Sequence, residues 1–269
     1  MEKICYLILM SSGLDSTAAL INLINKLIND KSLENSCLFP TYIWWRKIFI
    51  NVLQKEYDNC LKILDYLNNK YVKYKINLMP LKKIEIPLLF YEEIREDFKK
   101  IGRKNYWAHF RNTFFILSSL HYLLNYLNLK EIKDFHKIVI VTGFVGHEVD
   151  ENKTFIQNMG KLLNDSIIDE DGTKNPYIID YVKDFEFYCP YILNKDIKSR
   201  SLQYLDLKNF GCWDILEFTW SCWRRDKIPC YDCSGCETRS SKYKGFKKTD
   251  KELKDPFFKF REKKRVLSK

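Results

Sequence analysis

A continuous apolar run at residues 4–10, ending at the small residues Ser11, Ser12 and Gly13, constrains the fold more than any other feature. A run of this kind is typical of a strand buried on both faces of a parallel sheet. A helical pattern of apolar residues follows at residues 16–27. We therefore predict a strand–turn–helix junction at the start of an α/β fold.

Strand and helix patterns alternate along the rest of the chain. Strands are predicted at residues 37–43, 71–78, 137–142 and 185–188, and helices at residues 48–67, 110–127 and 195–205. Residues 80–103 show no decisive pattern, and residues 165–176 are typical of a polar loop. This alternation predicts a Rossmann-like parallel sheet with helices on both faces.

Length and charge narrow the classes of function. The 269 residues suffice for one α/β domain with an appended module. The formal net charge of +10 suits anionic ligands, but much of the excess lies in residues 242–269, so we do not expect a nucleic-acid-binding surface. The first apolar run is too short for a secretory signal or a membrane span, and we expect a cytoplasmic protein with no membrane contact.

The junction after the first strand has the residues of a phosphate-binding loop. Small residues let backbone N–H groups turn inward, and a helix N-terminus adds partial positive charge. No Gly-Lys-Ser/Thr follows, so this is not a Walker A loop. The alternative is an ordinary junction capped by Asp15 or Ser16. The candidate residues are Met10, Ser11, Ser12, Gly13, Leu14, Asp15, Ser16 and Thr17.

Four of the nine cysteines form a second signal near the end of the chain. Cys222, Cys230, Cys233 and Cys236 have the spacing of thiolates that surround one tetrahedral ion. A reducing compartment favours a metal site over disulfides, and a closed four-thiolate site predicts a structural Zn²⁺. Free thiols, a redox pair and an iron–sulfur cluster are the alternatives. The remaining cysteines are predicted to pack in the core: Cys5, Cys37, Cys60, Cys189 and Cys212.

These two signals resemble known families. Residues 11–17 resemble the Ser-Gly-Gly-x-Asp-Ser signature of PP-loop ATP pyrophosphatases, with Ser12 at the position of the first glycine. Together with the cysteine segment, the chain resembles the 7-cyano-7-deazaguanine synthases of queuosine biosynthesis, over nearly its whole length. The further matching segments are Trp220-Ser221-Cys222-Trp223, Pro229-Cys230, residues 233–239 ending at Arg239, Phe110-Arg111-Asn112, Val141-Thr142-Gly143 and residues 190–195.

The resemblance implies a HUP-type PP-loop domain at residues 1–218 and a zinc-binding module with a basic tail at residues 219–269. It implies that ATP with Mg²⁺ adenylates a carboxylate on a 7-deazaguanine and that ammonia then gives an amide and a nitrile. The loop residues would bind the leaving pyrophosphate, with Asp15 and Ser16 in catalytic positions. Arg111 and Lys195 would contact phosphate or the adenylate, and Thr142 and Gly143 would line the nucleotide site. A homodimer is a further expectation from the family.

The sequence departs from that family on the side of the expected acceptor. Residues 42–46, Tyr-Ile-Trp-Trp-Arg, replace a Tyr-Gly-Gln-Arg-like segment, and residues 144–150 replace part of the base pocket. The aromatic residues Trp44, Trp45, Tyr106 and Trp107 either stack on a base or pack the core. His147, Glu148 and Asp150 either act as acid/base or magnesium-binding groups or form a solvated loop.

Because the changes concentrate near the acceptor, the chain also resembles divergent members of the family found in anti-phage defence operons. There the deazaguanine would be joined to an amine of a partner protein. Two other hypotheses stay open: a non-catalytic nucleotide-binding scaffold whose tail at residues 242–269 docks a partner or packs on its own surface, and a PP-loop tRNA thiolation enzyme, which needs a redox-active cysteine or cluster.

Overall fold

The computed structural model describes residues 3–45, 50–86, 111–132, 135–145, 152–167, 182–192, 202–222, 224–230, 233, 235–236 and 239. Its centre is a five-stranded parallel sheet with the order β3-β2-β1-β4-β5. The strands are β1 (Lys3–Met10), β2 (Ser36–Trp44), β3 (Lys82–Glu85), β4 (Phe135–Val141) and β5 (Asp184–Tyr188). The predicted Rossmann-like parallel sheet with helices is therefore confirmed.

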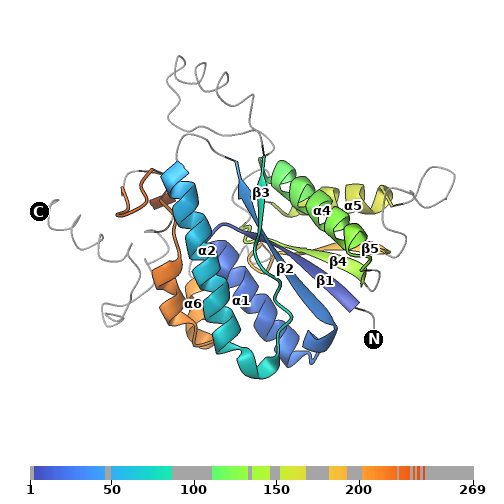
Figure 1. The fold of residues 1–269 in the computed structure, drawn as a ribbon, viewed down its shortest axis with the longest axis horizontal. Helices are drawn as coiled ribbons and strands as arrows, with labels where there is room; N and C mark the ends of the chain where they lie inside the picture. Colours follow the sequence, from blue (N-terminus) through green and yellow to red (C-terminus); the bar gives the residue numbers. More distant parts are fainter. Residues whose placement is uncertain are drawn as a thin grey trace, which may run out of the picture.

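Helices cover both faces of the sheet (Figure 1). Helices α1 (Leu14–Asn29), α2 (Ile50–Lys70) and α6 (Leu202–Asn209) pack on one face, and α4 (Arg111–Leu129) and α5 (Lys153–Asp165) on the other. Strand residues alternate between the two cores: Ile8 and Val139 face the first, whereas Leu7 and Ile138 face the second. This alternation follows from the two-residue period of a strand.

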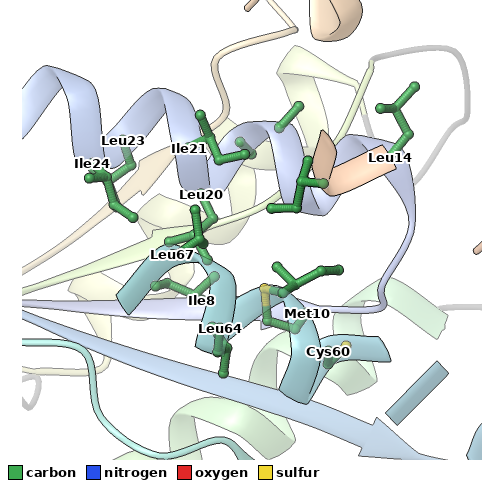
Figure 2. Close-up of a cluster of buried hydrophobic side chains, with 14 of the residues drawn as sticks. Ile8, Met10, Leu14, Leu20, Ile21, Leu23, Ile24, Cys60, Leu64 and Leu67 are labelled. Carbon is green, nitrogen blue, oxygen red and sulfur yellow. The ribbon is translucent and has the colours of Figure 1, made fainter. Parts of the chain in front are cut away.

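The larger core lies between β1, α1 and α2. Figure 2 shows α1 lying over β1, with α2 closing the cluster from the side. The labelled side chains of this core are Ile8, Met10, Leu14, Leu20, Ile21, Leu23, Ile24, Cys60, Leu64 and Leu67. The described part of the cysteine segment joins the same cluster through Trp220, Cys222, Cys233 and Cys236. The segment therefore packs against the core of the sheet domain.

The strand predicted at residues 71–78 is wrong. Residues Val72–Tyr74 form a 3-10 helix that ends at Lys75 in a left-handed conformation, with φ of 50°. Val72 is 70% exposed, whereas Tyr71 is buried in the core and Ile76 and Leu78 pack partly against it. The chain reaches the sheet at Leu78, which makes an isolated bridge to Leu38, and β3 begins only at Lys82. Pro80 lies between them and has no N–H to continue the ladder.

Other elements differ in extent or were not predicted. Helix α5 was not expected; it begins after Asn152, whose side chain accepts a hydrogen bond from the Phe155 N–H at 2.9 Å. Helix α6 continues to Asn209, four residues beyond the predicted end at residue 205. The start of that predicted helix lies outside the described residues, as do residues 106–107, residues 147–150 and the tail at residues 242–269. Among the described residues, no helix has the length and apolarity to span a bilayer.

The order of the strands places a switch point at the centre of the sheet. The chain proceeds outward from β1 to β2 and β3, then returns to place β4 on the other side of β1. Ligands of open α/β sheets bind outside the carboxyl ends of the strands at such a point. Met10 and Val141, the last residues of β1 and β4, end there. The loops that follow them therefore form the expected ligand site.

Candidate functional site

A cavity of about 320 Å³ lies at this switch point. It is lined from β1, β2 and β4, from α1, α2 and α4, and from the segment that contains the cysteines. Most of the site residues predicted outside the cysteine cluster line it: Met10, Ser11, Gly13, Leu14, Asp15, Ser16, Arg111, Thr142 and Gly143. Ser12 and Thr17 do not line it, and Lys195 lies outside the described residues. Tertiary structure thus brings together three segments that are far apart in the sequence.

Hydroxyl and backbone groups fix the shape of the loop between β1 and α1. The hydroxyls of Ser11 and Ser16 share a hydrogen bond at 3.1 Å, and the Ser11 N–H donates to Ser16 Oγ at 3.3 Å. The Ser16 hydroxyl also lies 3.2 Å from the carbonyl oxygen of Gly13, to which it donates. Two cavity-lining hydroxyls are therefore held close to the start of α1.

The N-terminus of α1 opens into the cavity. Gly13 is the N-cap, in an extended conformation with φ of −66° and ψ of 157°. A glycine has no side chain to cap the first turn, so the N–H groups of Leu14, Asp15 and Ser16 have no capping partner from it. These N–H groups and the helix dipole favour an anion here. Asp15, in the same turn, adds a carboxylate to the cavity wall.

Ser12 has a conformation that favours glycine. Its φ is 49°, in the left-handed region, where a β-carbon costs about 1–2 kcal/mol. Its side chain is fully buried, and among the described residues its hydroxyl has no hydrogen-bond partner. The same holds for the buried hydroxyl of Thr17. The residue that departs from the family signature is therefore the one at which the turn demands left-handed backbone.

Gly143 brings the end of β4 against the loop. A β-carbon at Gly143 would lie 2.4 Å from the carbonyl carbon of Asp15 and 2.4 Å from the amide nitrogen of Ser16. Both atoms belong to the backbone, so no side-chain rotation can relieve the contact. Only glycine allows this approach.

Thr142, next to Gly143, is anchored to the end of β5. Its N–H donates to the Tyr188 carbonyl at 3.1 Å, and its hydroxyl lies 3.1 Å from the Cys189 sulfur. Burial raises the pKa of the Cys189 thiol to about 11, against the opposing effect of the Thr142 hydrogen bond. Cys189 is therefore a neutral thiol near pH 7 and has no thiolate character.

Aromatic side chains and a carboxylate line another part of the cavity. Trp45 and Phe115 are in edge-to-face contact, with ring centroids 5.5 Å apart. The Tyr42 hydroxyl has one proton to donate and lies 3.2 Å from the Leu53 carbonyl oxygen and 3.1 Å from the Glu56 carboxylate. Trp44, by contrast, packs against the core on the α1 and α2 face. Of the two adjacent tryptophans, only Trp45 lines the cavity.

The cysteine segment provides a further wall, which includes Trp220, Ser221, Gly235 and Arg239. The backbone N–H of Trp220 donates to the Ser12 carbonyl at 2.8 Å. Arg239 is 1% exposed and donates three hydrogen bonds to hydroxyl groups. Its acceptors are Tyr204 at 3.2 Å, Ser221 at 3.1 Å and Thr219 at 2.5 Å. The segment is thus part of the cavity.

The four predicted metal ligands come together. The sulfur atoms of Cys222, Cys230, Cys233 and Cys236 all lie within 4.8 Å of one another. The Cys230 and Cys236 sulfurs are 3.9 Å apart, and the Cys233 and Cys236 sulfurs 3.5 Å. A tetrahedral ion with metal–sulfur bonds of about 2.3 Å separates its ligands by about 3.8 Å. The donor set and its spacing therefore fit one metal ion.

The other cysteines do not belong to this cluster. Cys5, Cys60 and Cys212 are fully buried and Cys37 is 6% exposed, which confirms the prediction that they pack in the core. Cys189 is only partly buried, beside Thr142. Burial raises the pKa of the Cys60 thiol, which also interacts with the backbone of Ser12.

Some cavity residues were not predicted as site residues from the sequence. Arg239 had a signal, because it follows the last cysteine in the matched segment, but its burial and its cavity position were not foreseen. Glu56 and Phe115 had none: each is one residue of an amphipathic helix. They come to the cavity only through the packing of α2 and α4 on the sheet.

The chain has little similarity to known proteins. No protein-family model matches the chain, and no curated protein matches it. Among solved structures, the U34-tRNA thiolase NcsA from Methanococcus maripaludis with its [4Fe-4S] cluster is similar over 99% of this chain and 72% of that chain. The sequence identity is 16% and the TM-score 0.35, which is too low to support an argument.

Proposed function

We propose that this protein is an ATP-dependent enzyme of the PP-loop type that adenylates a carboxylate and releases pyrophosphate. The observation that carries the proposal is the close approach of Gly143 to the backbone of Asp15 and Ser16. It places the start of α1, the hydroxyls of Ser11 and Ser16, and the end of β4 around one cavity. This is an anion-binding arrangement at a topological switch point.

The loop residues would bind the polyphosphate of ATP. The N–H groups of Leu14, Asp15 and Ser16 would donate to the leaving pyrophosphate. The hydroxyls of Ser11 and Ser16 would rotate from their present partners to do the same. The Asp15 carboxylate has the wrong charge to contact phosphate directly, so we assign it to a Mg²⁺ ion that accompanies ATP. Arg111, which also lines the cavity, would neutralise charge at the α-phosphorus.

The reaction would begin with attack of a substrate carboxylate oxygen on the α-phosphorus of ATP. The bond between the α-phosphorus and the bridging oxygen breaks, giving an acyl-adenylate and pyrophosphate. An amine or ammonia then attacks the acyl carbon, AMP leaves, and a C–N bond forms. The protein's share of this chemistry is to position the two reactants and to stabilise the departing charge.

The carboxylate substrate that we propose is a 7-deazaguanine, such as 7-carboxy-7-deazaguanine. Trp45 and Phe115, which line the cavity, would offer an aromatic ring face for a bicyclic base. Glu56, oriented by the Tyr42 hydroxyl, offers a carboxylate to the N–H groups of such a base. With ammonia the product would be an amide and, after a second activation by ATP, a nitrile. With a protein amine it would be a modified partner.

We propose that the cysteine cluster binds Zn²⁺. The thiolates of a four-iron cluster each bind a different iron, so their sulfurs lie farther apart than ligands around one ion. The separations of 3.5 and 3.9 Å support a single ion. When bound, zinc would supply only a structural crosslink, because four thiolates leave no open coordination position.

Mass spectrometry of the protein incubated with ATP, Mg²⁺, 7-carboxy-7-deazaguanine and ammonium tests the function. The expected products are AMP, pyrophosphate and the deazaguanine amide or nitrile. AMP and pyrophosphate without either product would direct the search to a protein amine acceptor. Sulfur transfer to tRNA would replace the proposal with thiolation. No ATP turnover by folded, metal-loaded protein would overturn it in favour of a nucleotide-binding scaffold.

A matched pair of serine variants assigns the activity to this cavity. Ser16→Ala removes a hydroxyl that lines it, and we expect AMP release to fall by about 10²-fold or more. Ser166→Ala is the control, because the Ser166 hydroxyl donates to the Leu163 carbonyl at the end of α5 and Ser166 does not line the cavity. It should keep the activity of the unchanged protein. Equal activities of the two variants would place the reaction elsewhere.

A further inference from the structure

The cysteine segment touches the phosphate loop directly. The backbone N–H of Trp220 donates to the Ser12 carbonyl at 2.8 Å, and Ser12 is the loop residue with φ of 49°. A hydrogen bond to this carbonyl fixes the orientation of the peptide that joins Ser12 to Gly13, the N-cap of α1. Trp220 therefore helps to hold the Ser12–Gly13 backbone in the conformation that leaves the N–H groups of the first turn of α1 exposed to the cavity.

Trp220 is in turn tied to the metal-binding residues. Its single indole Nε1–H makes a bifurcated hydrogen bond to the carbonyls of Cys222 and Arg225, each at 3.1 Å. Cys222 is one of the four ligands, and Arg225 lies between the first two ligands in the sequence. The Trp220 ring is 4% exposed and lies under the Lys55 ammonium group, 5.6 Å from the ring centroid. The indole is thus held on several sides.

Arg239 makes a second connection across the same segment. It follows the last ligand, Cys236, by three residues and donates to the hydroxyls of Ser221 and Thr219, which flank Trp220. Its Nε donates to Tyr204 of α6. A buried guanidinium with three directed hydrogen bonds has a narrow choice of positions. Arg239 therefore holds residues 219–221 between the metal-binding residues and α6.

From these contacts we infer that Trp220 and Arg239 are positioning residues through which the bound metal holds Ser12, and hence the phosphate loop, in its anion-binding conformation. The metal would hold Cys222, whose carbonyl accepts from the Trp220 indole, and Cys236, which precedes Arg239 by three residues. The backbone N–H of Trp220 then holds the Ser12 carbonyl. The left-handed backbone of Ser12 is unfavourable by itself and persists only where its surroundings impose it. The inference rests on the proposed function in taking residues 11–17 as the pyrophosphate-binding loop.

The test compares two tryptophan variants of the metal-loaded protein. Trp220→Phe keeps an aromatic ring but removes the indole N–H that bonds Cys222 and Arg225. Trp213→Phe is the control, because Trp213 lies in the neighbouring 3-10 helix, packs edge-to-face on Tyr204 and does not line the cavity. Two quantities are measured: the affinity for inorganic pyrophosphate with Mg²⁺, by calorimetry, and amide hydrogen exchange at residues 11–17.

We expect Trp220→Phe to retain its metal, to bind pyrophosphate about tenfold more weakly and to exchange residues 11–17 faster, while β1 and β4 exchange as before. Trp213→Phe should match the unchanged protein. Arg239→Lys, which keeps the charge but cannot bridge three hydroxyls, should change both quantities in the same direction. Chelation of the metal should do so more strongly, and added zinc should restore both.

Unchanged exchange at residues 11–17 in metal-loaded Trp220→Phe, or a change equal to that of Trp213→Phe, would overturn the inference. Chelated protein that stays folded with an unchanged loop would also do so. The proposed function fails separately, if the unchanged protein binds no pyrophosphate. In that event the exchange measurement still decides whether the metal holds the loop.

Discussion

Gly143 and Asp15 lie so close that a β-carbon on Gly143 would be 2.4 Å from the carbonyl carbon of Asp15. Gly143 lies two residues after the end of β4, and Asp15 is the second residue of α1. The contact joins the two sides of the switch point backbone to backbone. The approach of these two segments beside the start of α1 therefore depends on the absence of a β-carbon at residue 143.

The first prediction follows from this contact. Gly143→Ala should displace residues 15–16, lower the free energy of unfolding by about 1–3 kcal/mol and weaken pyrophosphate binding by about tenfold or more. Urea unfolding and calorimetry measure the two effects. Gly160→Ala in α5 is the control: its β-carbon would meet Phe187 at an ordinary 3.8 Å, and a helical glycine replaced by alanine should be neutral or stabilising. Similar losses in both variants would contradict the prediction.

The second prediction concerns the backbone of Ser12. Ser12→Gly should keep the fold and pyrophosphate binding, because glycine adopts a φ of 49° without strain. Ser12→Ala removes the hydroxyl, which has no partner among the described residues, but retains the β-carbon. Ser12→Gly should therefore be at least as stable as Ser12→Ala in thermal unfolding. A Ser12→Gly variant that loses binding would show that the hydroxyl itself contacts the ligand.

The third prediction concerns the metal. Elemental analysis of purified protein should find zinc at one ion per chain and no stoichiometric iron. Cys233→Ser should lose the metal and become markedly easier to unfold, since the ion crosslinks a segment packed on the core. Cys189→Ser, outside the cluster, should retain it. Iron together with acid-labile sulfide in the unchanged protein would replace zinc with an iron–sulfur cluster.

The fourth prediction is a pH dependence. Burial raises the pKa of the Cys189 thiol from its ordinary value of 9.0 to about 11. The unfolded chain releases this proton at lower pH than the folded chain. The contribution of the neutral Cys189 thiol to the free energy of unfolding is therefore complete below about pH 9 and is lost as the pH rises through about 11. Cys189→Ala should show a shallower loss of stability over this window in urea unfolding at a series of pH values. Parallel curves for the two proteins would refute the assignment.

The cavity combines features that lie at very different distances along the chain. The alternation of strands and helices, the small residues after β1 and the spacing of the four cysteines are local patterns. Each acts on its own segment: apolar periodicity buries one face, small residues permit a tight turn, and closely spaced thiolates can surround one ion. For this reason the parallel fold, the tight turn after β1 and the cluster of four cysteines could be predicted from the sequence.

Local patterns misled where packing overrides them. Residues 71–78 have the composition of a strand, yet the chain forms a 3-10 turn there and joins the sheet later, at Lys82–Glu85. Helix α5 has a strong apolar face but follows a polar stretch, and its start is marked only by the side chain of Asn152. The edge strand β3 has four residues, which are too few to show the apolar pattern by which a strand is predicted from sequence.

What the sequence alone determined is the set of parts: a parallel sheet, a loop of small residues after its first strand, and four cysteines at the spacing of metal ligands. The tertiary structure decided how they meet. It placed Gly143 against Asp15 and the backbone N–H of Trp220 within hydrogen-bond distance of the Ser12 carbonyl. It also brought Arg239 and Glu56 to one cavity. The physical reason is that such contacts join residues more than a hundred positions apart, and their energies depend on the packing of whole helices and strands on the sheet, which no local pattern encodes.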